Sequence, residues 1–269
     1  MPDSIVRSAR FDNCGRNAWV LRSLDDPDVY RVACDKCKDR FCTPCASERA
    51  NSIAASVGEF AEERSIRLIT LTLRISERTL KQDVDRLYAA FVKLRRRATW
   101  RATQAGGVYF VEIKRRRGDD GWHTHMHILA EGSWLSKSWL SHAWNEITKD
   151  SFIVDIRMCD SAAKAAQYVA KYAGKGVHGS CYHEPKILLE AMRALKGRRL
   201  VGKWGTWRDL DLDVEIPPGA WERVSTLQVL LENCKDDDTE ALQILEALRG
   251  SAAIAADARA PPSQLEMPF

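Results

Sequence analysis

Hydrophobic and polar residues alternate along two segments in the middle of the chain, and a period of two predicts β-strands. The first segment, residues 66–74, reads IRLITLTLR, and residues 108–114 show the same alternation. Between them, from Ser76 onwards, apolar residues recur at helical spacing: Leu80, Val84, Leu87, Tyr88, Phe91 and Leu94. A helix that packs on a sheet has this spacing, so the pattern predicts a βα unit.

Four further elements are expected after the Gly106-Gly107 pair, which should break the helical segment before the strand at 108–114. Residues 116–121, RRGDDG, suit a hairpin turn, and a third strand over residues 121–130 would pair back on the second. A helix over 136–147, a strand over 152–157 and a helix capped by Asp160 that ends near Gly174 or Gly176 complete the pattern. The order βαββαβα predicts an α+β fold with helices packed on an antiparallel sheet.

The two ends of the chain give weaker patterns. The first 60 residues are rich in cysteine and arginine, and periodicity fades again beyond Gly205. Residues 250–269, in which alanine, proline and serine dominate, are expected to form a flexible tail. We therefore predict a small cysteine-rich zinc-binding region over residues 1–60, a central domain over 61–205 and an acidic helical region with a tail over 206–269.

Composition places the chain among folded proteins. With 269 residues, of which 45% are hydrophobic and 29% charged, it can bury a core and is not a disulfide-stabilised or disordered sequence. Apolar runs stay shorter than the roughly 18 residues that a membrane helix needs, and the first residues lack the pattern of a signal peptide. We therefore expect a cytoplasmic protein that does not bind membranes.

Charge is unevenly distributed along the chain. Residues 67–117 hold 14 Lys and Arg against 4 Asp and Glu, and residues 161–203 hold 9 against 2, whereas residues 209–269 carry 13 acidic and 4 basic side chains. Basic blocks with interleaved aromatic residues favour a nucleic-acid partner, because neutralised phosphates release counterions. The alternative is that these basic helices only present solvated faces.

Three of the six histidines occupy alternate positions in the segment WHTHMHIL. Side chains at i and i+2 of a strand point to one face, so His123, His125 and His127 should project together, and neighbouring imidazoles could share a cation. Glu112 is the only carboxylate on the strand predicted to lie beside them. Such a mixed set suits Mg²⁺ or Mn²⁺ acting as a Lewis acid better than a structural zinc ion.

The last predicted helix of the central domain carries two tyrosines one turn apart. At 100° per residue one stripe holds Lys164, Tyr168, Lys171, Tyr172 and Lys175, and alanines cover the opposite side. Ammonium groups beside a phenol favour the phenolate and hold phosphate, as a tyrosine that attacks a phosphodiester requires. The alternative is that the tyrosines only pack and the lysines only face solvent.

Together these segments resemble the HUH endonucleases, and among them the rolling-circle replication initiators of plasmids and small phages. The resemblance rests on three ordered motifs: Leu71-Thr-Leu-Arg74, His125-Met126-His127 and Tyr168-Val-Ala-Lys-Tyr172-Ala-Gly-Lys175. It implies an RRM- or ferredoxin-like nuclease core over residues 61–205, with a catalytic Mg²⁺ or Mn²⁺ held by the paired histidines and Glu112.

The resemblance also implies an activity. Tyr172 would be the primary nucleophile that nicks single-stranded origin DNA, Tyr168 the second, and Lys175 would lie near the scissile phosphate. The products would be a 5′-phosphotyrosine and a free 3′-OH, and the same chemistry would rejoin strands. Further DNA contacts are expected from basic residues near these motifs: Arg74, Arg115, Arg116, Arg117, Lys164 and Lys171.

Other functions remain open at this point. A two-tyrosine transposase would use the same chemistry, a conjugative relaxase is more distant, and a non-catalytic zinc-dependent DNA-binding regulator belongs to a different class. The sequence contains no G-x-x-x-x-G-K-[ST] motif, so unwinding of the duplex is expected to need a host helicase or supercoiling.

The pattern C-x2-C-x4-C-x2-C, formed by Cys34, Cys37, Cys42 and Cys45, predicts a structural Zn²⁺ site. Cys14, which precedes Gly15, could replace one ligand. A redox pair or an unrelated cysteine-rich turn is the alternative. We expect this region to contact DNA or to support the core.

The last six residues, QLEMPF, resemble the hexapeptide with which bacterial proteins bind the polymerase sliding clamp. Four side chains would carry this contact: Gln264, Leu265, Met267 and Phe269. Apolar anchors on an extended peptide could fill a hydrophobic groove. A plain disordered terminus is the alternative.

Overall fold

The structure is a computed structural model that describes residues 2–115, 121–173, 177–212 and 220–257. The chain divides into two compact units. The first unit combines residues 1–45 with residues 214–269, and the second unit comprises residues 46–213. None of the helices within the described ranges is both long enough and apolar enough to cross a bilayer.

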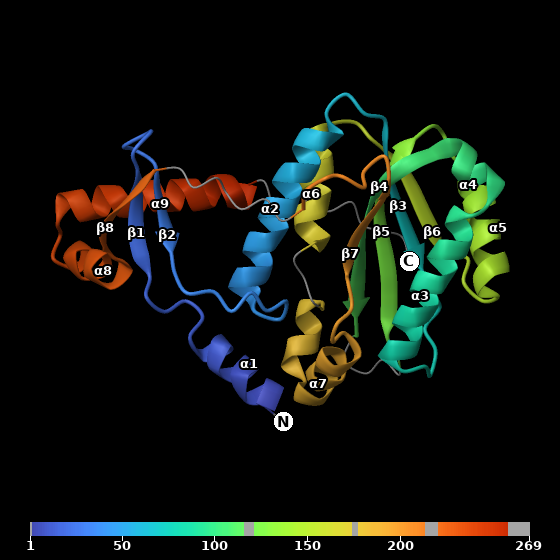
Figure 1. Ribbon diagram of the computed structural model, residues 1–269, viewed down its shortest axis with the longest axis horizontal. Coiled ribbons are helices and arrows are strands. Elements are labelled where there is room, and N and C mark those ends of the chain that lie inside the picture. Colours follow the sequence, from blue (N-terminus) through green and yellow to red (C-terminus); the bar gives the residue numbers. More distant parts are fainter. Residues whose placement is uncertain (1, 116–120, 174–176, 213–219, 258–269) are drawn as a thin grey trace. The chain divides into compact units, whose positions relative to one another are not determined.

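The second unit is built on a five-stranded antiparallel sheet with the order β6-β3-β5-β4-β7 (Figure 1). Its strands are β3 (Ile66–Thr72), β4 (Gln104–Lys114), β5 (His123–Gly132), β6 (Val154–Cys159) and β7 (Val201–Gly205). Its helices are α2 (Thr43–Ala61, from residue 46), α3 (Leu80–Arg95), α4 (Ala98–Thr103), α5 (Lys137–Thr148), α6 (Ala162–Tyr172) and α7 (Pro185–Ala194), with a 3-10 turn over Gly179–His183. The predicted α+β class with an antiparallel sheet is confirmed.

One face of this sheet packs against α2 and α6. Phe110 and Leu129 of the sheet are fully buried in one cluster with Ile53 of α2 and with Ala165 and Val169 of α6. Small residues on α6 allow the two helices to approach closely, because a Cβ added at Gly58 of α2 would lie 3.2 Å from the Cβ of Ala166. The alanine side of α6 therefore faces the core, as the sequence predicts.

The same face of the sheet changes from apolar to polar along the three central strands. Because β5 is antiparallel to both neighbours, the polar halves of the strands lie at one end of the sheet. The polar positions are Thr70 and Thr72 of β3, Glu112 and Lys114 of β4, and His123, His125 and His127 of β5. The sheet thus builds a polar site beside an apolar core.

The opposite face of the sheet packs against α3 and α5, which lie on the other side from α2 and α6 in Figure 1. The buried residues of α3 include five of the six that the sequence pattern predicts to face the sheet, Leu80, Val84, Leu87, Phe91 and Leu94, whereas the sixth, Tyr88, is half-buried. Trp144 of α5 is fully buried, and its indole nitrogen donates a hydrogen bond of 2.9 Å to the carbonyl oxygen of Thr72. This contact fixes the end of β3.

Capping residues set the starts of two helices, and one of these caps differs from the predicted one. Helix α3 begins at Leu80 behind a capping box in which Thr79 and Gln82 exchange hydrogen bonds. Ser161, and not Asp160, caps α6, because its hydroxyl accepts the hydrogen bond from the backbone nitrogen of Lys164. Asp160 instead pairs with the side chain of Lys164 at 2.6 Å.

The Gly106-Gly107 pair lies within β4, so the expectation that it precedes the strand is wrong. Helix α4 already ends at Thr103, and β4 begins at Gln104 with a register shift before Gly106. Gly107 is paired with Trp204 of β7, an unpredicted strand. A side chain at Gly107 would collide with the carbonyl oxygen of Leu129 and with the Trp204 ring, so close backbone approach explains this glycine.

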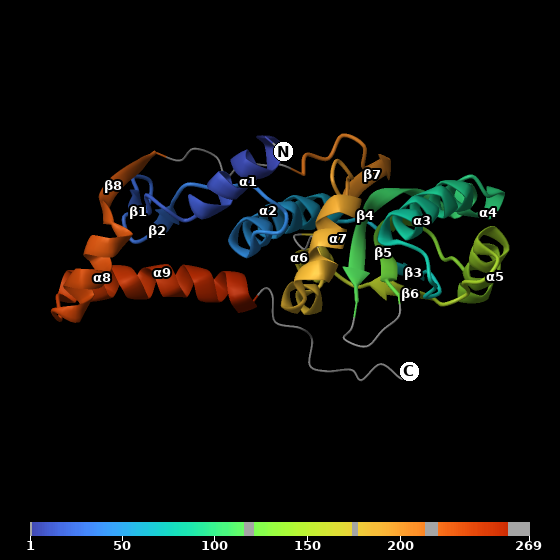
Figure 2. The same ribbon diagram turned by 90° about the horizontal axis from the view of Figure 1, so that it is seen from below.

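The first unit contains a three-stranded antiparallel sheet of order β2-β1-β8. Its elements are α1 (Pro2–Asp12), β1 (Trp19–Ser23), β2 (Tyr30–Ala33), β8 (Trp221–Thr226), α8 (Leu227–Lys235) and α9 (Thr239–Asp257). Val20 of β1 is buried with Leu230, Ala241 and Ile244 of α8 and α9, and Figure 2 shows α9 running along the sheet. The helices thus cover one face of this sheet.

This pairing changes the predicted organisation of the two ends of the chain. The unit boundaries differ from the predicted ones at residues 60 and 205, because β8 pairs with β1 and α2 packs on the core of the second unit. The predicted tail is wrong for residues 250–257, whose backbone continues α9. Alanine, which has the highest helix propensity, is frequent in this segment. The rest of the predicted tail lies outside the described residues.

Replacing Gly107 with alanine should lower the free energy of unfolding by about 2 kcal/mol, since the added methyl group overpacks the contact between β4, β5 and β7. Urea unfolding measures this change. The control is Gly179→Ala, because a Cβ there meets no atom within 4 Å and should change stability by less than about 0.5 kcal/mol. Equal stability of the two variants would contradict this packing.

Candidate active site

Strand register brings the predicted metal ligands together on the α6 side of the sheet. On β5, His125 lies directly opposite Glu112 of β4, and the hairpin between these strands is the one that the sequence predicts. On the other side of β5, His125 is paired with Thr72 and His127 with Thr70 of β3. The five side chains share one face because each strand has a period of two.

A hydrogen-bonded pair lies at the centre of this group. Nε2 of His127 lies 3.0 Å from Oε2 of Glu112, and both side chains are only 7% exposed. The ammonium group of Lys114 lies 3.0 Å from the same carboxylate oxygen. Burial acts to raise the pKa of Glu112, but the hydrogen bond from His127 and the charge of Lys114 lower it to about 2. Glu112 is therefore ionised.

His125 and His127 are neutral near physiological pH. Burial lowers the pKa of His125 to about 4, against the opposing effect of Glu112, and burial also lowers the pKa of His127. The rings of His123, His125 and His127 are stacked along β5 with centroids 6.5 and 6.2 Å apart. Neutral imidazoles beside an ionised carboxylate are in the protonation state that a divalent cation requires.

The spacing of these donors is wider than in a compact metal cluster. Among the residues that the structure describes, the cysteines of the first unit are the one group of three or more ligands whose donor atoms all lie within 4.8 Å of one another. The donor set of His125, His127 and Glu112 fits Mg²⁺ or Mn²⁺ in its chemistry.

Helix α6 brings both tyrosines to His127. Oη of Tyr168 lies 3.0 Å from Nδ1 of His127 and 3.2 Å from Oγ1 of Thr70. The ring of Tyr172 stacks on the ring of His127, with centroids 3.7 Å apart and an interplanar angle of 17°. The structure therefore joins the helix tyrosines and the strand histidines, two motifs about 40 residues apart in the sequence.

The two phenols differ in their surroundings. Burial raises the pKa of Tyr168 far above its usual value, and its hydroxyl is engaged by Thr70 and His127. Burial and the charge of Glu112 raise the pKa of Tyr172 to about 12. Both phenols are thus protonated at neutral pH, and Tyr172 would need nearby positive charge to react as a phenolate.

The predicted DNA-binding residues lie around this group with different partners. Lys171 places its ammonium group 5.3 Å from the centroid of the Tyr172 ring, whereas Lys164 is paired with Asp160. Arg115 lies over the Trp122 ring and 3.4 Å from Glu190. Three further predicted residues, Lys175, Arg116 and Arg117, lie outside the described residues, as do the predicted clamp-binding residues Gln264, Leu265, Met267 and Phe269.

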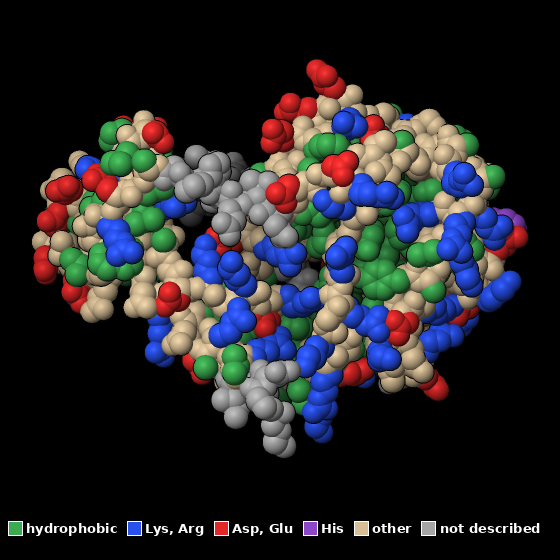
Figure 3. Space-filling view, in the orientation of Figure 1, with side chains coloured by type: hydrophobic (Ala, Val, Ile, Leu, Met, Phe, Trp, Pro, Cys, Tyr) green, Lys and Arg blue, Asp and Glu red, His purple; other side chains and the backbone are tan. Residues whose placement is uncertain are grey.

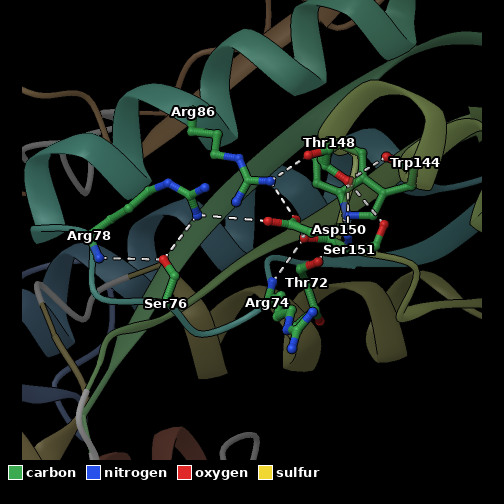
Figure 4. Close-up of polar contacts among 9 residues, drawn as sticks. All are labelled: Thr72, Arg74, Ser76, Arg78, Arg86, Trp144, Thr148, Asp150 and Ser151. Atoms are coloured by element: carbon green, nitrogen blue, oxygen red, sulfur yellow. Dashed lines mark hydrogen bonds and ion pairs between the residues drawn. The ribbon is translucent and has the colours of Figure 1, made fainter.

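An open depression of about 570 Å³ lies where β3 ends. Its lining includes Arg74, Arg78 and Asp150, and Figure 4 shows Arg78 and Arg86 directed toward Asp150. The hydroxyl of Ser151 donates to Asp150 and accepts a hydrogen bond of 2.9 Å from the backbone nitrogen of Arg74. Arg74 is exposed, and no carboxylate of the described ranges pairs with its guanidinium group.

Basic side chains extend over the surface of the second unit. In Figure 3 lysine and arginine gather over this unit around α3 and α7, whereas acidic side chains are frequent around α8 in the first unit. This distribution follows the uneven charge of the sequence. A basic surface suits a phosphate backbone.

The cysteine group of the first unit differs from the predicted one. Cys14, Cys37, Cys42 and Cys45 lie together, with Sγ atoms of Cys14 and Cys42 3.5 Å apart. Such a group could hold a tetrahedral zinc ion. Cys34, a predicted ligand, is outside it, so the predicted set is wrong in this member.

Backbone pairing explains this exchange of cysteines. The nitrogen of Gly15 donates to the carbonyl oxygen of Asp35, and the nitrogen of Asp35 donates to the carbonyl oxygen of Arg16, at 2.8 and 2.9 Å. The pairing brings the segment of Cys14 alongside the segment that follows β2. Spacing along the chain cannot show this contact, although the sequence already indicates Cys14 as a possible replacement.

Three residues of the site were not among the predicted candidates: Thr70, Thr72 and Lys114. The signal for the threonines was present, because the alternation in LITLTLR has the same period as the alternation of the histidines. A register between the two strands was needed to match each threonine with a histidine.

The sequence of this site matches a known family. A profile described as "Replication protein", Rep_1, matches residues 31–243, which include segments of both units. The chain belongs to the Rep_1 family. The match covers the histidine strand, the tyrosine helix and most of the cysteine group.

Curated relatives of this Rep_1 protein share low identity with it. The chain is 21% identical over 214 residues to a protein named "Protein rep" from Streptococcus pneumoniae, covering 72% of this chain and 63% of that protein. Two further proteins of the same name, from Bacillus sp. and Bacillus amyloliquefaciens, are 25% and 23% identical. The alignments cover 67% and 78% of this chain and 71% and 74% of those proteins. No solved structure matches the chain significantly.

In this Rep_1 protein, Cys14→Ser should remove most of the zinc, because a thiolate ligand is lost from a four-cysteine site. Atomic absorption on the purified full chain should give about one zinc ion per wild-type chain and close to none for the variant. Cys34→Ser is the matched control and should retain the metal. Loss of zinc from the Cys34 variant alone would contradict the observed grouping.

Proposed function

We propose that this protein initiates rolling-circle replication of a plasmid by nicking single-stranded origin DNA. The observation that carries the proposal is the stacking of Tyr172 on His127, which also contacts Glu112. It would bring the proposed nucleophile and the proposed cation-binding group together at one point. Membership in a replication-protein family and relatives named "Protein rep" support the proposal.

The side chains of the sheet would hold the cation and the phosphate. Mg²⁺ or Mn²⁺ bound by His125, His127 and Glu112 would act as a Lewis acid on a non-bridging oxygen of the scissile phosphate. Lys171 adds positive charge beside Tyr172, and Lys175 is proposed to act in the same way. Positive charge at this position stabilises both the phenolate and the negative charge that develops on the phosphate.

Tyr172 is the proposed nucleophile. Its Oη loses a proton and bonds to phosphorus, the bond from phosphorus to the 3′ oxygen breaks, and that oxygen takes up a proton. The products are a 5′-phosphotyrosine and a free 3′-OH. Because the phosphotyrosine replaces one phosphoester bond with another, the reverse attack can rejoin strands without ATP.

The rest of the origin DNA would be held by basic side chains near the sheet. Arg74, which follows β3 and lines the depression at its end, would bind one phosphate, while Lys164, Arg115 and the arginines at 116 and 117 would bind neighbouring phosphates. A host helicase would unwind the duplex. Residues 264–269 would bind the sliding clamp and bring a polymerase to the new 3′-OH.

Replacing Tyr172 with phenylalanine should abolish the covalent protein–DNA adduct, because no oxygen remains to attack the phosphate. Incubation with single-stranded origin DNA and Mn²⁺, followed by a denaturing gel, should show a loss of more than about a thousandfold in adduct. The matched control is Tyr109→Phe, which changes a half-buried tyrosine on the opposite face of the sheet.

The gel separates the proposed nickase from a DNA-binding regulator. A full-strength adduct with Tyr172→Phe would contradict the role of this tyrosine. Absence of any adduct from the wild-type protein, with DNA binding retained, would favour the non-catalytic function.

A further inference from the structure

Three hydroxyl groups lie next to the Nδ1 atoms of His125 and His127, and the proposed nicking reaction gives them no role. Oγ1 of Thr72 lies 3.1 Å from Nδ1 of His125, and Oγ1 of Thr70 lies 3.2 Å from Nδ1 of His127. The Tyr168 hydroxyl lies 3.0 Å from the same atom of His127. We call Thr70, Thr72 and Tyr168 the hydroxyl layer.

The arrangement repeats because of the strand register. Thr72 is directly opposite His125, and Thr70 is directly opposite His127, in the antiparallel pair of β3 and β5. Each threonine therefore meets the histidine across from it through the same ring atom. Two similar contacts at alternate positions of the strand hold the two imidazoles in similar orientations, with an angle of 27° between the ring planes.

These contacts involve Nδ1 of each ring, so Nε2 remains for contacts with the other groups of the active site. For His127 the second nitrogen, Nε2, is the atom that meets Glu112. A cation shared by the histidines and Glu112 would therefore be bound through Nε2, and the hydroxyl layer would hold the far edge of each ring. Partners of this kind fix the tautomer and the orientation of metal-binding histidines.

A hydroxyl group suits this position for a specific reason. When Nε2 of His127 donates a hydrogen bond to Glu112, Nδ1 is an acceptor and the hydroxyl donates to it. When Nε2 gives its lone pair to a cation, Nδ1 carries the proton and donates to the same hydroxyl oxygen. A carboxylate could only accept and an ammonium group could only donate, so a hydroxyl supports both states without movement of the ring.

We propose that Thr70, Thr72 and Tyr168 are positioning residues that fix His125 and His127 for binding a divalent cation through Nε2. The inference rests on the proposed function of this site. It also gives Tyr168 a role other than that of a second nucleophile, since its hydroxyl is at the Nδ1 edge of His127, away from Glu112. Tyr172, whose hydroxyl has no such contact with a described histidine nitrogen, keeps the role of nucleophile.

The test measures Mn²⁺ binding to the zinc-loaded full-length protein by isothermal titration calorimetry. Thr72→Val keeps the shape of the side chain and removes the hydroxyl, and it should weaken Mn²⁺ binding by about 10- to 100-fold. Thr72→Ser keeps the hydroxyl, and its Mn²⁺ affinity should lie within about threefold of the wild-type value. The same pair of substitutions at Thr70 should show a smaller loss, because Tyr168 also contacts His127.

Thr124→Val is the matched control. Thr124 lies on β5 between the histidines but points to the opposite face, is fully buried, and has a hydroxyl without a hydrogen-bond partner among the described residues. Its Mn²⁺ affinity should equal that of the wild type. Urea unfolding of each variant checks that a loss of affinity does not come from loss of the fold.

Tyr168→Phe completes the test. It should still form the covalent adduct through Tyr172, but half-maximal adduct formation should require a higher Mn²⁺ concentration. Wild-type affinity for Mn²⁺ in Thr72→Val would overturn the inference while leaving the nickase proposal intact. Loss of the Tyr168→Phe adduct with unchanged Mn²⁺ affinity would also overturn the inference, and it would give Tyr168 a part in the covalent step. Absence of Mn²⁺ binding by the wild-type protein would overturn both.

Discussion

The antiparallel register of β3, β5 and β4 is the constraint on which the site depends. It sets His125 between Thr72 and Glu112, and a slip of one residue would turn the histidines to the opposite face of the sheet. The apolar halves of the same strands oppose such a slip, because Phe110 and Leu129 are buried against α2 and α6. The hydrophobic core therefore fixes the register, and the register in turn places the polar site at one end of the sheet.

Helix α6 supplies the second half of the site through its small residues. Ala165 and Val169 are buried in the core on one side of the helix, and Gly58 of α2 leaves room for Ala166. This close packing allows the last turn of α6 to reach the polar end of the sheet, where Tyr172 stacks on His127. Larger side chains at the alanine positions would move α6 away from the sheet. The alanines therefore help to keep Tyr172 in contact with His127.

The sequence predicts those parts of the molecule that depend on local pattern. Alternation and helical spacing place β3, β5 and α3, and the hairpin places Glu112 beside the histidines. Local patterns do not predict pairing between segments that are far apart in the sequence. Strand β8 pairs with β1 although the two lie near opposite ends of the chain. The pairing of Gly15 with Asp35 brings Cys14 into the cysteine group in which Cys34 was expected. Thr70 and Thr72 could be predicted only in part. Their alternation can be read from the sequence, but their histidine partners depend on which strands are neighbours in the sheet.

The charges of the site would limit its affinity for the proposed divalent cation. Glu112 is buried and ionised, and Lys114 and His127 share its charge. A divalent cation bound by the same carboxylate would lie near the ammonium group of Lys114, and two like charges in a buried site repel each other. This repulsion from Lys114 would offset part of the attraction between Glu112 and the cation. Moderate affinity would follow, and it would suit Mg²⁺ or Mn²⁺ that binds together with a phosphate, whose negative charge would offset the repulsion.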